Sequence, residues 1–523
     1  MFVTDPTQAA QTIAEGYRFD STALELGTVS VDGHVDPTAK VRIPLAMMNR
    51  HGLVAGATGT GKTKTLQLIA EQLSANGVPV VMADIKGDLS GLSRPGAPND
   101  KITARASQTG DDWAPTAYPV EFVSLGGDGI GVPVRATMSA FGPILLSKVL
   151  GLNETQESTL GLIFHWADKN GLPLLDLKDI RSVIAYLTSD EGKPELKAIG
   201  GVSTQTAGVI LRALTNLEAA GGDTFFGEPE IEPADLSRVS PDGKGIITLF
   251  ELAGAQATNP VLFSTFLVWI LADLFEHLPE VGDIDKPKLV FIFDESHLLF
   301  DGASKTFVDQ VVQTVKLIRS KGVGVFFCSQ LPTDIPDEVL SQLGARIQHA
   351  LRAFTPNDQK ALTKTVKTYP VSDVYKLDQA LTSLGTGEAI VTVLSEKGAP
   401  TPVAWTVVRA PRSSMEAVAA ADITAAAKAS ELFAKYGTPV DNESAYEKLA
   451  AKMLSPGESP DAPPPTPAPA PEPKPAPAPA PEEPGMITEI LTSKPMQSFL
   501  RNAASQAGRE FSRAIFGTGR RRR

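Results

Sequence analysis

The segment from residue 51 to residue 77 constrains the fold of this chain more than any other. Residues 56–63 have the sequence Gly-Ala-Thr-Gly-Thr-Gly-Lys-Thr, which is the pattern G-x-x-x-x-G-K-[ST]. The apolar run at 51–55 is long enough for a buried strand, and residues 65–73 show helical spacing that ends at Asn76-Gly77. Strand, glycine loop and helix in this order predict a loop whose backbone N–H groups point at phosphate groups.

The side chains of this phosphate-binding (Walker A) loop suit a nucleoside triphosphate and its metal. Lys62 supplies a point charge for the β- and γ-phosphates, and the Thr63 hydroxyl is placed to bind Mg²⁺. We expect the nucleotide to be held by Gly56, Ala57, Thr58, Gly59, Thr60, Gly61, Lys62, Thr63 and Thr65.

Composition and charge exclude several classes of protein. With 523 residues the chain is too long for one average domain, and its hydrophobic content of 42% supports a sizeable core. The most apolar stretch, residues 263–274, is interrupted by Ser264, Thr265 and Asp273, so we expect no membrane-spanning helix. The polar N-terminus predicts no secretory signal, and the single cysteine, Cys328, suits a reducing cytoplasm. The net charge of −12 argues against a generally basic nucleic-acid coat but leaves room for a locally basic channel.

Between residue 52 and about residue 408, apolar strands alternate with helical segments. Runs such as Leu-Val-Phe-Ile-Phe at 289–293 are typical of strands covered on both faces, which predicts a mostly parallel α/β sheet. The candidate strands are 79–84, 120–125, 245–252, 289–294, 323–329, 346–353 and 388–394. Residues 139–236 are instead mainly helical, for example at 141–152 and 206–218, and we interpret them as a helical insertion between core strands.

We divide the chain into five segments by these patterns. They are a short N-terminal β segment (1–45), the core with the phosphate loop (46–412, insertion at 139–236), a helical extension (413–454), a Pro/Ala/Glu linker (455–485) and a basic amphipathic helix with an arginine tail (486–523). Residues 414–454 are rich in Ala, Glu and Lys and predict exposed helix. The linker cannot bury enough surface to fold, so we expect a disordered, extended spacer on the order of 90 Å long.

The last segment combines an apolar stripe, which includes Leu500 and Phe511, with arginines such as Arg509 on the opposite side. Three uses are open for this helix: docking on the protein's own body or on a neighbour, binding an anionic membrane surface, or touching nucleic acid. Small apolar residues such as Ala504 favour helix packing over deep insertion into lipid.

An acidic pair is the second half of the predicted nucleotide site. The apolar run 289–293 ends in Asp294-Glu295. At the carboxyl edge of the sheet, Asp294 would hold Mg²⁺ and Glu295 would polarise the attacking water. Two solvated carboxylates at a strand end are the structural alternative.

Two further strand ends carry polar side chains that suit this site. The run 323–330 ends in Ser329-Gln330, and Gln330 could sense the γ-phosphate by hydrogen bonding, or simply cap its strand. Asp84 follows another strand, where it would lie near the metal, although an aspartate before Lys-Gly is also a turn former. Cys328, inside an apolar run, predicts an inert buried thiol.

Together these motifs resemble those of the HerA/FtsK group of P-loop ATPases, and most closely the bacterial HerA-helicase-like (YjgR-like) family. The resemblance rests on the phosphate loop, on Ala-Asp-Ile-Lys-Gly-Asp-Leu-Ser-Gly at 83–91, on Phe-Asp-Glu-Ser-His at 293–297 and on the run ending in Ser-Gln at 322–330. It implies a RecA/FtsK-like P-loop NTPase fold, ATP and Mg²⁺ as cofactors, and a homo-oligomer in the form of a hexameric ring. It also implies that Arg319 serves as an arginine finger for a neighbour's nucleotide, with Lys321 as a weaker candidate.

Three functions follow as alternatives. The first is a cytoplasmic, ATP-driven ring motor on duplex DNA, for which the three lysines in 360–367 are candidate contacts, although their spacing also describes a solvated helix. The second is a P-loop ATPase that acts on a protein or membrane-associated partner recruited through residues 486–523. The third is a nucleotide-switched scaffold with negligible turnover, which the presence of Glu295 disfavours.

Overall fold

The computed structural model describes most of the chain up to residue 454. The described residues are 5–454 except for Ile85, Asp128, Ile199, 252–259 and Asp283. The predicted linker (455–485) and the predicted C-terminal helix (486–523) lie outside the described residues.

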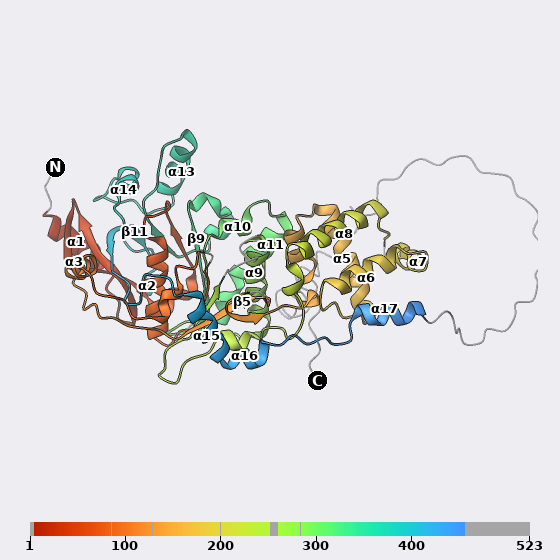
Figure 1. Cartoon of the computed structure of the whole chain (residues 1–523). Helices are drawn as coiled ribbons and strands as arrows, with labels where there is room; N and C mark the ends of the chain where they lie inside the picture. Colours follow the sequence, from red (N-terminus) through yellow and green to blue (C-terminus); the bar gives the residue numbers. More distant parts are fainter. Residues whose placement is uncertain are drawn as a thin grey trace, which may run out of the picture.

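A single twelve-stranded sheet organises the molecule (Figure 1). In sheet order its strands are β2 (His34–Pro44), β1 (Ala23–Val31), β12 (Ala404–Val408), β11 (Glu388–Thr392), β10 (Ala345–Gln348), β3 (Gly52–Ala55), β9 (Val323–Ser329), β8 (Leu289–Phe293), β4 (Val80–Asp84), β7 (Ile247–Glu251), β5 (Val120–Leu125) and β6 (Val132–Val134). The strands from β10 to β6 pair in parallel, whereas β11, β12, β1 and β2 pair antiparallel. The predicted mostly parallel α/β P-loop fold is therefore confirmed.

The central parallel strands are mostly apolar because both faces of the sheet are covered there. In β8, Leu289, Phe291 and Phe293 enter one hydrophobic cluster. Val290 and Ile292 point to the opposite face and enter a second cluster. All five side chains are at most 2% exposed, so this continuous run has no solvent-facing position.

Helices cover the two faces of the sheet and extend beyond one edge. In chain order they are α1 (Pro6–Glu15), α2 (Lys62–Ala75), α3 (Asp100–Thr109), α4 (Met138–Leu150), α5 (Glu154–Lys169), α6 (Leu177–Thr188), α7 (Lys193–Ala198), α8 (Thr204–Ala219), α9 (Pro260–His277), α10 (His297–Phe300), α11 (Lys305–Ile318), α12 (Asp337–Leu340), α13 (Pro356–Val366), α14 (Leu377–Ser383), α15 (Ala420–Ala429), α16 (Glu431–Tyr436) and α17 (Ala445–Leu454). Apolar residues of α2 join the cluster on one face, and those of α9 and α11 join the cluster on the other. Among the described ranges, no helix is both long enough and apolar enough to cross a membrane.

The predicted helical stretch is present as α4–α8, which lie beside the sheet on the right of Figure 1. Polar side chains fix where these helices begin. Asn153 caps α5 and Asp176 caps α6, each in a capping box with the third residue of its helix. The rings of Trp166 and Tyr186 stack at 5.6 Å and hold α5 against α6.

The sequence did not predict β6 and β12, and β12 joins the N-terminal residues to the sheet. β6 has only three residues, and β12 follows β11 in an antiparallel hairpin. β12 also pairs with β1, so the β1–β2 hairpin extends the central sheet. Gly27 is required at this contact, because a Cβ at this position would lie 2.0 Å from Val407 O.

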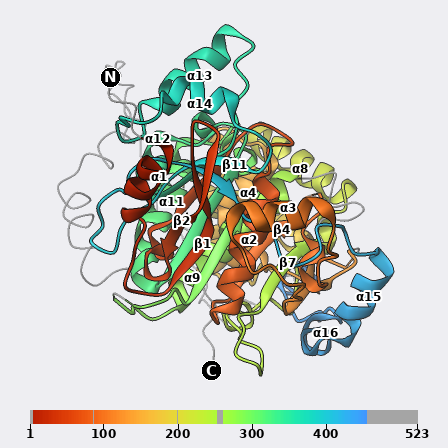
Figure 2. The ribbon, with the colours of Figure 1, turned by 90° about the vertical axis from the view of Figure 1, so that its left-hand side faces the viewer.

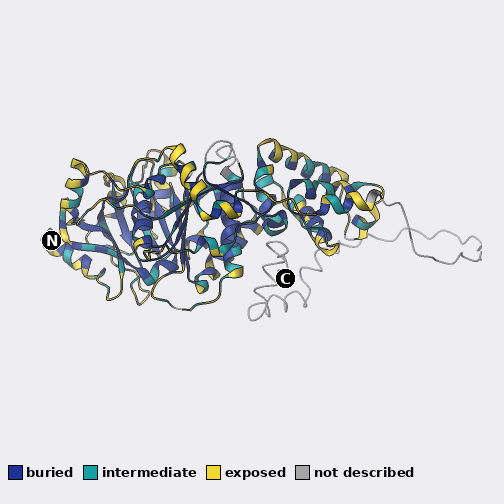
Figure 3. Cartoon of the chain, turned by 60° about the horizontal axis from the view of Figure 1, so that its bottom comes forward, coloured by how far each residue is buried: buried dark blue, intermediate teal, exposed yellow. Residues whose placement is uncertain are grey.

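Residues 414–454 contain helices and are mostly exposed, as predicted, but a few of their side chains are buried. Three short helices, α15–α17, are found here, and they bury side chains against the body of the protein (Figure 3). Tyr436 is fully buried, and its hydroxyl donates to Asp235 Oδ2 and accepts from Glu232 N. The few large residues that anchor the segment form no clear pattern in this alanine-rich sequence.

Candidate nucleotide site

The phosphate loop has the backbone that its glycines predict. It connects β3 to α2, and Gly56, Gly59 and Gly61 have φ values of 152°, 79° and 114°. These values lie in the region that favours glycine. At Gly61 a Cβ would also come within 3.2 Å of the Gly387 backbone, so a side chain would disturb both loop conformation and packing.

The backbone amides divide the loop into an anchoring half and an open half. The Gly56 amide donates to Ser329 O at 3.2 Å, and the Ala57 amide donates to Ala350 O at 2.8 Å. We had expected these two residues to bind phosphate, but their amides hold the loop to the chain at the ends of β9 and β10. The first-turn amides of α2 have no acceptor within their helix, so they are the donors suited to an anion.

Lys62 lies inside the loop. Its Nζ donates to Gly56 O at 2.7 Å and to Ala57 O at 3.3 Å, and the residue is 9% exposed. The Thr60 hydroxyl closes the same turn by donating to Ala57 O at 2.7 Å. The ammonium group is thereby held where the loop curves around its centre, and Thr63 follows on the first turn of α2.

The acidic pair lies one strand away from the loop. β9 lies between β3 and β8, so Asp294-Glu295 follows β8 at a distance of two strand spacings, about 10 Å, from the chain after β3. The end of β9 connects the two halves. Ser329 O accepts from the Gly56 amide, and Cys328 O accepts from both the amide and the hydroxyl of Ser296. The sequence places these residues more than 200 positions apart, and the sheet brings them to one edge.

The oxygen atoms at this edge fit a magnesium ion. Asp294 is 7% exposed, and its Oδ1 accepts from the Glu295 amide at 2.9 Å. Burial, and then the charge of Glu295, raise the pKa of Asp294, while a hydrogen bond from the Cys328 thiol opposes them. A carboxylate that is costly to bury is stabilised by a cation, and carboxylate and hydroxyl oxygens are the hard donors that Mg²⁺ prefers. Thr63 and Asp294 are thus suited to hold it.

Glu295 is held by a residue for which the sequence had suggested no role. Lys86 Nζ donates to Glu295 Oε1 at 2.5 Å, while Oε2 lies 3.4 Å from His297 Nδ1. Oε2 is buried and makes no hydrogen bond within the described residues. Glu295 also has φ of 46°, a conformation that a non-glycine residue adopts at a cost. The Asp-x-Lys-Gly-Asp motif had been noted in the sequence, but only strand pairing shows that Lys86 reaches the glutamate.

Comparison with known proteins assigns the chain to a family. A match to the family described as Helicase HerA-like C-terminal spans residues 31–523. The chain belongs to this family. It is 23% identical over 375 residues to the DNA double-strand break repair helicase HerA of Sulfurisphaera tokodaii, over 71% of this chain and 68% of the relative. The protein of the same name in Pyrococcus furiosus is 21% identical over 397 residues, with the same two shares.

Solved structures of related fold include the bacterial conjugative coupling protein TrwBdeltaN70. It aligns with a TM-score of 0.48 and 15% identity over 78% of this chain and 94% of that chain. The resemblance to HerA/FtsK-type P-loop ATPases that the motifs indicated is confirmed by the family match.

In this HerA-like ATPase, the side chain of Thr65, which we predict to contact the nucleotide, is buried and bonded to His349. The Thr65 side chain is 1% exposed, and its hydroxyl lies 2.9 Å from His349 Nε2. His349 Nδ1 donates to Glu388 O, so Nε2 accepts from Thr65. Burial lowers the pKa of His349 to about 4, and the ring is neutral at pH 7. Thr65 and His349 therefore position the loop from behind, and His349 carried no sequence signal that could have found it.

Asp84 forms a turn, which is the alternative to metal binding that the sequence left open. Its Oδ1 accepts from the Asp88 amide, and its Oδ2 accepts from the amides of Leu89 and Ser90. The side chain is 1% exposed, and burial raises its pKa to about 6. With these three bonds the carboxylate shapes the loop that carries Lys86.

Gln330 and Arg319 lie at opposite ends of β9. Gln330 is exposed at the carboxyl edge, between the phosphate loop and Asp294. Arg319 lies in the short helical turn Arg319–Lys321, before the amino end of the strand. The seven residues of β9 separate the two by about 20 Å, so Arg319 lies far from the nucleotide edge of its own subunit. Lys321 Nζ lies over the ring of Phe275 at 5.5 Å.

A buried carboxyl near this edge gives the first prediction, for Glu251→Gln. Burial and the neighbouring Asp84 raise the pKa of Glu251 to about 8 from its ordinary value of 4.5. Its contribution to stability is therefore complete below about pH 4.5 and is lost as the pH rises to about 8. Glutamine does not titrate, so the stability of the variant relative to wild type should increase over this window by up to about 1.4 kcal/mol per pH unit. Denaturant unfolding across the window measures this, and a difference independent of pH would contradict it.

Proposed function

We propose that this protein hydrolyses ATP with Mg²⁺ and works as an oligomeric ring motor on duplex DNA in the cytoplasm. The observation that carries the proposal is the arrangement around β9, where the phosphate loop is bonded to Ser329 and Ser296, which directly follows the acidic pair, is bonded to Cys328. The phosphate loop and the acidic pair are two strand spacings apart, about 10 Å. This separation suits a metal-bound triphosphate that lies across the end of β9.

Each residue then has a role that its surroundings support. Lys62 and the first-turn amides of α2 bind phosphate oxygens, and Thr63 and Asp294 hold Mg²⁺, which neutralises charge on the β- and γ-phosphates when bound. Glu295 accepts a proton from the attacking water through Oε2, the oxygen that Lys86 leaves free. Lys86 positions this glutamate, and Gln330 detects the γ-phosphate from the end of β9.

The position of Arg319 supports an oligomer. A guanidinium at the far end of β9 does not serve the nucleotide of its own subunit. It can complete a neighbour's site, and an arginine supplied in this way makes hydrolysis depend on correct assembly. A hexameric ring is the assembly that the family resemblance implies.

A lysine face on α13 supports DNA as the partner. Lys360, Lys364 and Lys367 are all exposed and follow the spacing of one helix face. α13 projects from the body in Figures 1 and 2. The two curated relatives carry the name of DNA double-strand break repair helicases, which points the same way. The alternative partner, a protein or membrane surface bound through residues 486–523, rests on residues outside the described part.

The second prediction tests the DNA partner. Duplex DNA should raise the rate of ATP hydrolysis several-fold at low salt and less at high salt, because phosphate contacts release counterions. Replacing Lys360, Lys364 and Lys367 by alanine should remove this stimulation. The control replaces Lys169 and Lys197, which are exposed on α5 and α7, and should keep it. A rate that no DNA changes at either salt concentration would exclude the DNA motor while leaving ATP hydrolysis to be judged from the basal rate.

A further inference from the structure

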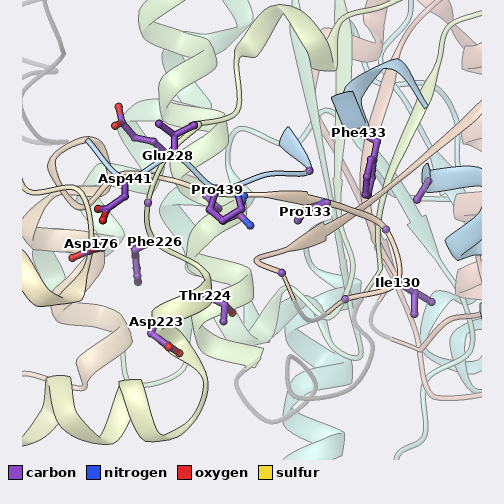
Figure 4. A pocket seen from close by; sticks show the side chains of 18 of the residues that line it. Ile130, Pro133, Asp176, Asp223, Thr224, Phe226, Glu228, Phe433, Pro439 and Asp441 are labelled. Atoms are coloured by element: carbon purple, nitrogen blue, oxygen red, sulfur yellow. The ribbon is translucent and has the colours of Figure 1, made fainter. Parts of the chain in front are cut away.

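A cavity lies far from the nucleotide site (Figure 4). Its volume is about 700 Å³, within the range of small-molecule sites. Its walls come from the loop between β5 and β6, from residues 223–228 and from the chain between α15 and Asp441. β6 is six strands from β3 in the sheet, which places the cavity roughly 25–30 Å from the phosphate loop.

The cavity contains a buried arginine for which the described part of the chain supplies no counterion. Arg135 follows β6, is 6% exposed and lines the cavity. Its Nη1 donates to Tyr436 O at 3.1 Å, and among the described residues it forms no ion pair. Burial lowers the pKa of Arg135, and no carboxylate offsets this. Because a buried charge without a partner is costly, and because four of the five guanidinium donors remain, the site is suited to an oxyanion.

Of the four carboxylates that line the cavity, Asp176, Glu228 and Asp441 are bonded to other groups, and Asp223 is the fourth. Asp176 Oδ1 accepts from the amides of Lys178 and Asp179, at the start of α6. Glu228 Oε2 accepts from Asn442 Nδ2, and Asp441 Oδ1 pairs with Lys178 Nζ at 3.0 Å. These bonds hold the three carboxylates in place on other partners, so Arg135 stays available to a ligand.

Glycines keep the guanidinium open to the cavity. A Cβ at Gly127 would lie 3.8 Å from Arg135 Nη2, and a Cβ at Gly227 would lie 3.8 Å from Arg135 Cδ. Any longer side chain at either position would extend over the arginine. Gly129 and Gly131 line the same wall, so backbone amides are the groups that an anion would meet there.

The remaining walls suit a planar apolar group. Phe226 and Phe433 lie apart in Figure 4 with Pro439 and Pro133 between them, and Ile130 and Val440 also line the cavity. Aromatic rings and prolines of this kind favour a flat ring over a flexible chain.

We propose that this cavity binds a small phosphate-bearing molecule with a planar ring, about the size of a mononucleotide, against Arg135. Arginine and glycine amides together favour phosphate because the guanidinium fork and backbone N–H groups both match its oxygens. Such a ligand would contact both the end of the sheet and α15–α16. Its binding would not require the phosphate loop.

The third prediction tests this site in the full chain carrying Lys62→Met, so that the phosphate loop does not contribute. AMP and inorganic phosphate should both bind, by equilibrium dialysis at constant ionic strength, and AMP should raise the unfolding temperature. Adding Arg135→Met should weaken the affinity for AMP and the affinity for inorganic phosphate by about 10- to 100-fold each. Because this change removes an uncompensated buried charge, it should not lower the unfolding temperature of the ligand-free chain.

Two further variants keep the test decisive. Phe433→Leu should weaken AMP binding several-fold and leave inorganic phosphate unaffected. Arg181→Met, which removes an arginine paired with Glu218 on a helix surface outside the cavity, should change neither. Three outcomes would each overturn the proposal. They are equal binding with and without Arg135, no binding of either probe at millimolar concentration, and binding of succinate alone.

Discussion

Replacing Glu295 by glutamine should leave Mg-ATP binding intact and reduce its turnover by about 10²- to 10⁴-fold, the usual contribution of a positioned general base. The amide keeps the size of the side chain and can still accept from Lys86, but it cannot take a proton from water through the position of Oε2. The variant therefore separates binding from chemistry. Single-turnover hydrolysis, together with the affinity for a fluorescent ATP analogue, measures both quantities.

Glu251→Gln is the matched control for this change. Glu251 is also a buried glutamate at the carboxyl edge of the sheet, but it follows β7, two strands beyond β8. Its raised pKa keeps the carboxyl protonated at pH 7, so an amide resembles the form already present. Turnover should stay close to that of wild type. If Glu295→Gln hydrolyses ATP within a few-fold of the Glu251→Gln rate, the assignment of the general base is wrong.

Lys62→Met should reduce kcat/KM for ATP by about 10³-fold, mainly through lost affinity. The ammonium lies within the loop and is held by Gly56 O and Ala57 O, so its charge is already oriented toward the phosphates before they bind. Charge-assisted hydrogen bonds to phosphate are about twice as strong as neutral ones, and methionine keeps only the apolar stem. Isothermal titration with a non-hydrolysable ATP analogue and steady-state kinetics check the two parts of the effect.

Lys64→Met controls for the loss of a lysine from the same helix turn. Lys64 Nζ is also partly buried and bonds to carbonyl groups, at Met415 O (3.0 Å) and Asp88 O (3.5 Å), but it faces away from the loop. Its removal should alter stability more than ATP affinity. Equal losses of affinity in the two variants would show that the helix start, and not the Lys62 charge, determines binding.

Much of the nucleotide site could be predicted from the sequence because its signals are local. The glycine pattern fixes a backbone conformation at Gly56, Gly59 and Gly61, and the apolar run of β8 ends at Asp294-Glu295. Each signal lies within about ten residues and depends on backbone geometry or burial, which a short sequence determines. For the same reason the strands predicted between residues 79 and 394 are present, with their ends shifted.

The sequence was least informative where a residue's partner lies elsewhere in the chain or where two local roles compete. Asp84 has a carboxylate suited to metal or to a turn, and the three amides that follow it take both oxygens. Thr65 looked like part of the loop motif, but His349, from the end of β10, occupies its hydroxyl. The buried anchors of residues 414–454, such as Tyr436, are few among alanines.

By itself, the sequence determined the loop, the strands and the identity of the acidic pair, because backbone preference and the pattern of apolar residues act over short stretches. The tertiary structure alone decided that β9 lies between β3 and β8, that Lys86 reaches Glu295 and that Arg135 is buried with no ion pair to any described residue. Those contacts depend on which strands pair and in which order. Strand order is set by the packing of segments distant in sequence, and no local pattern encodes it.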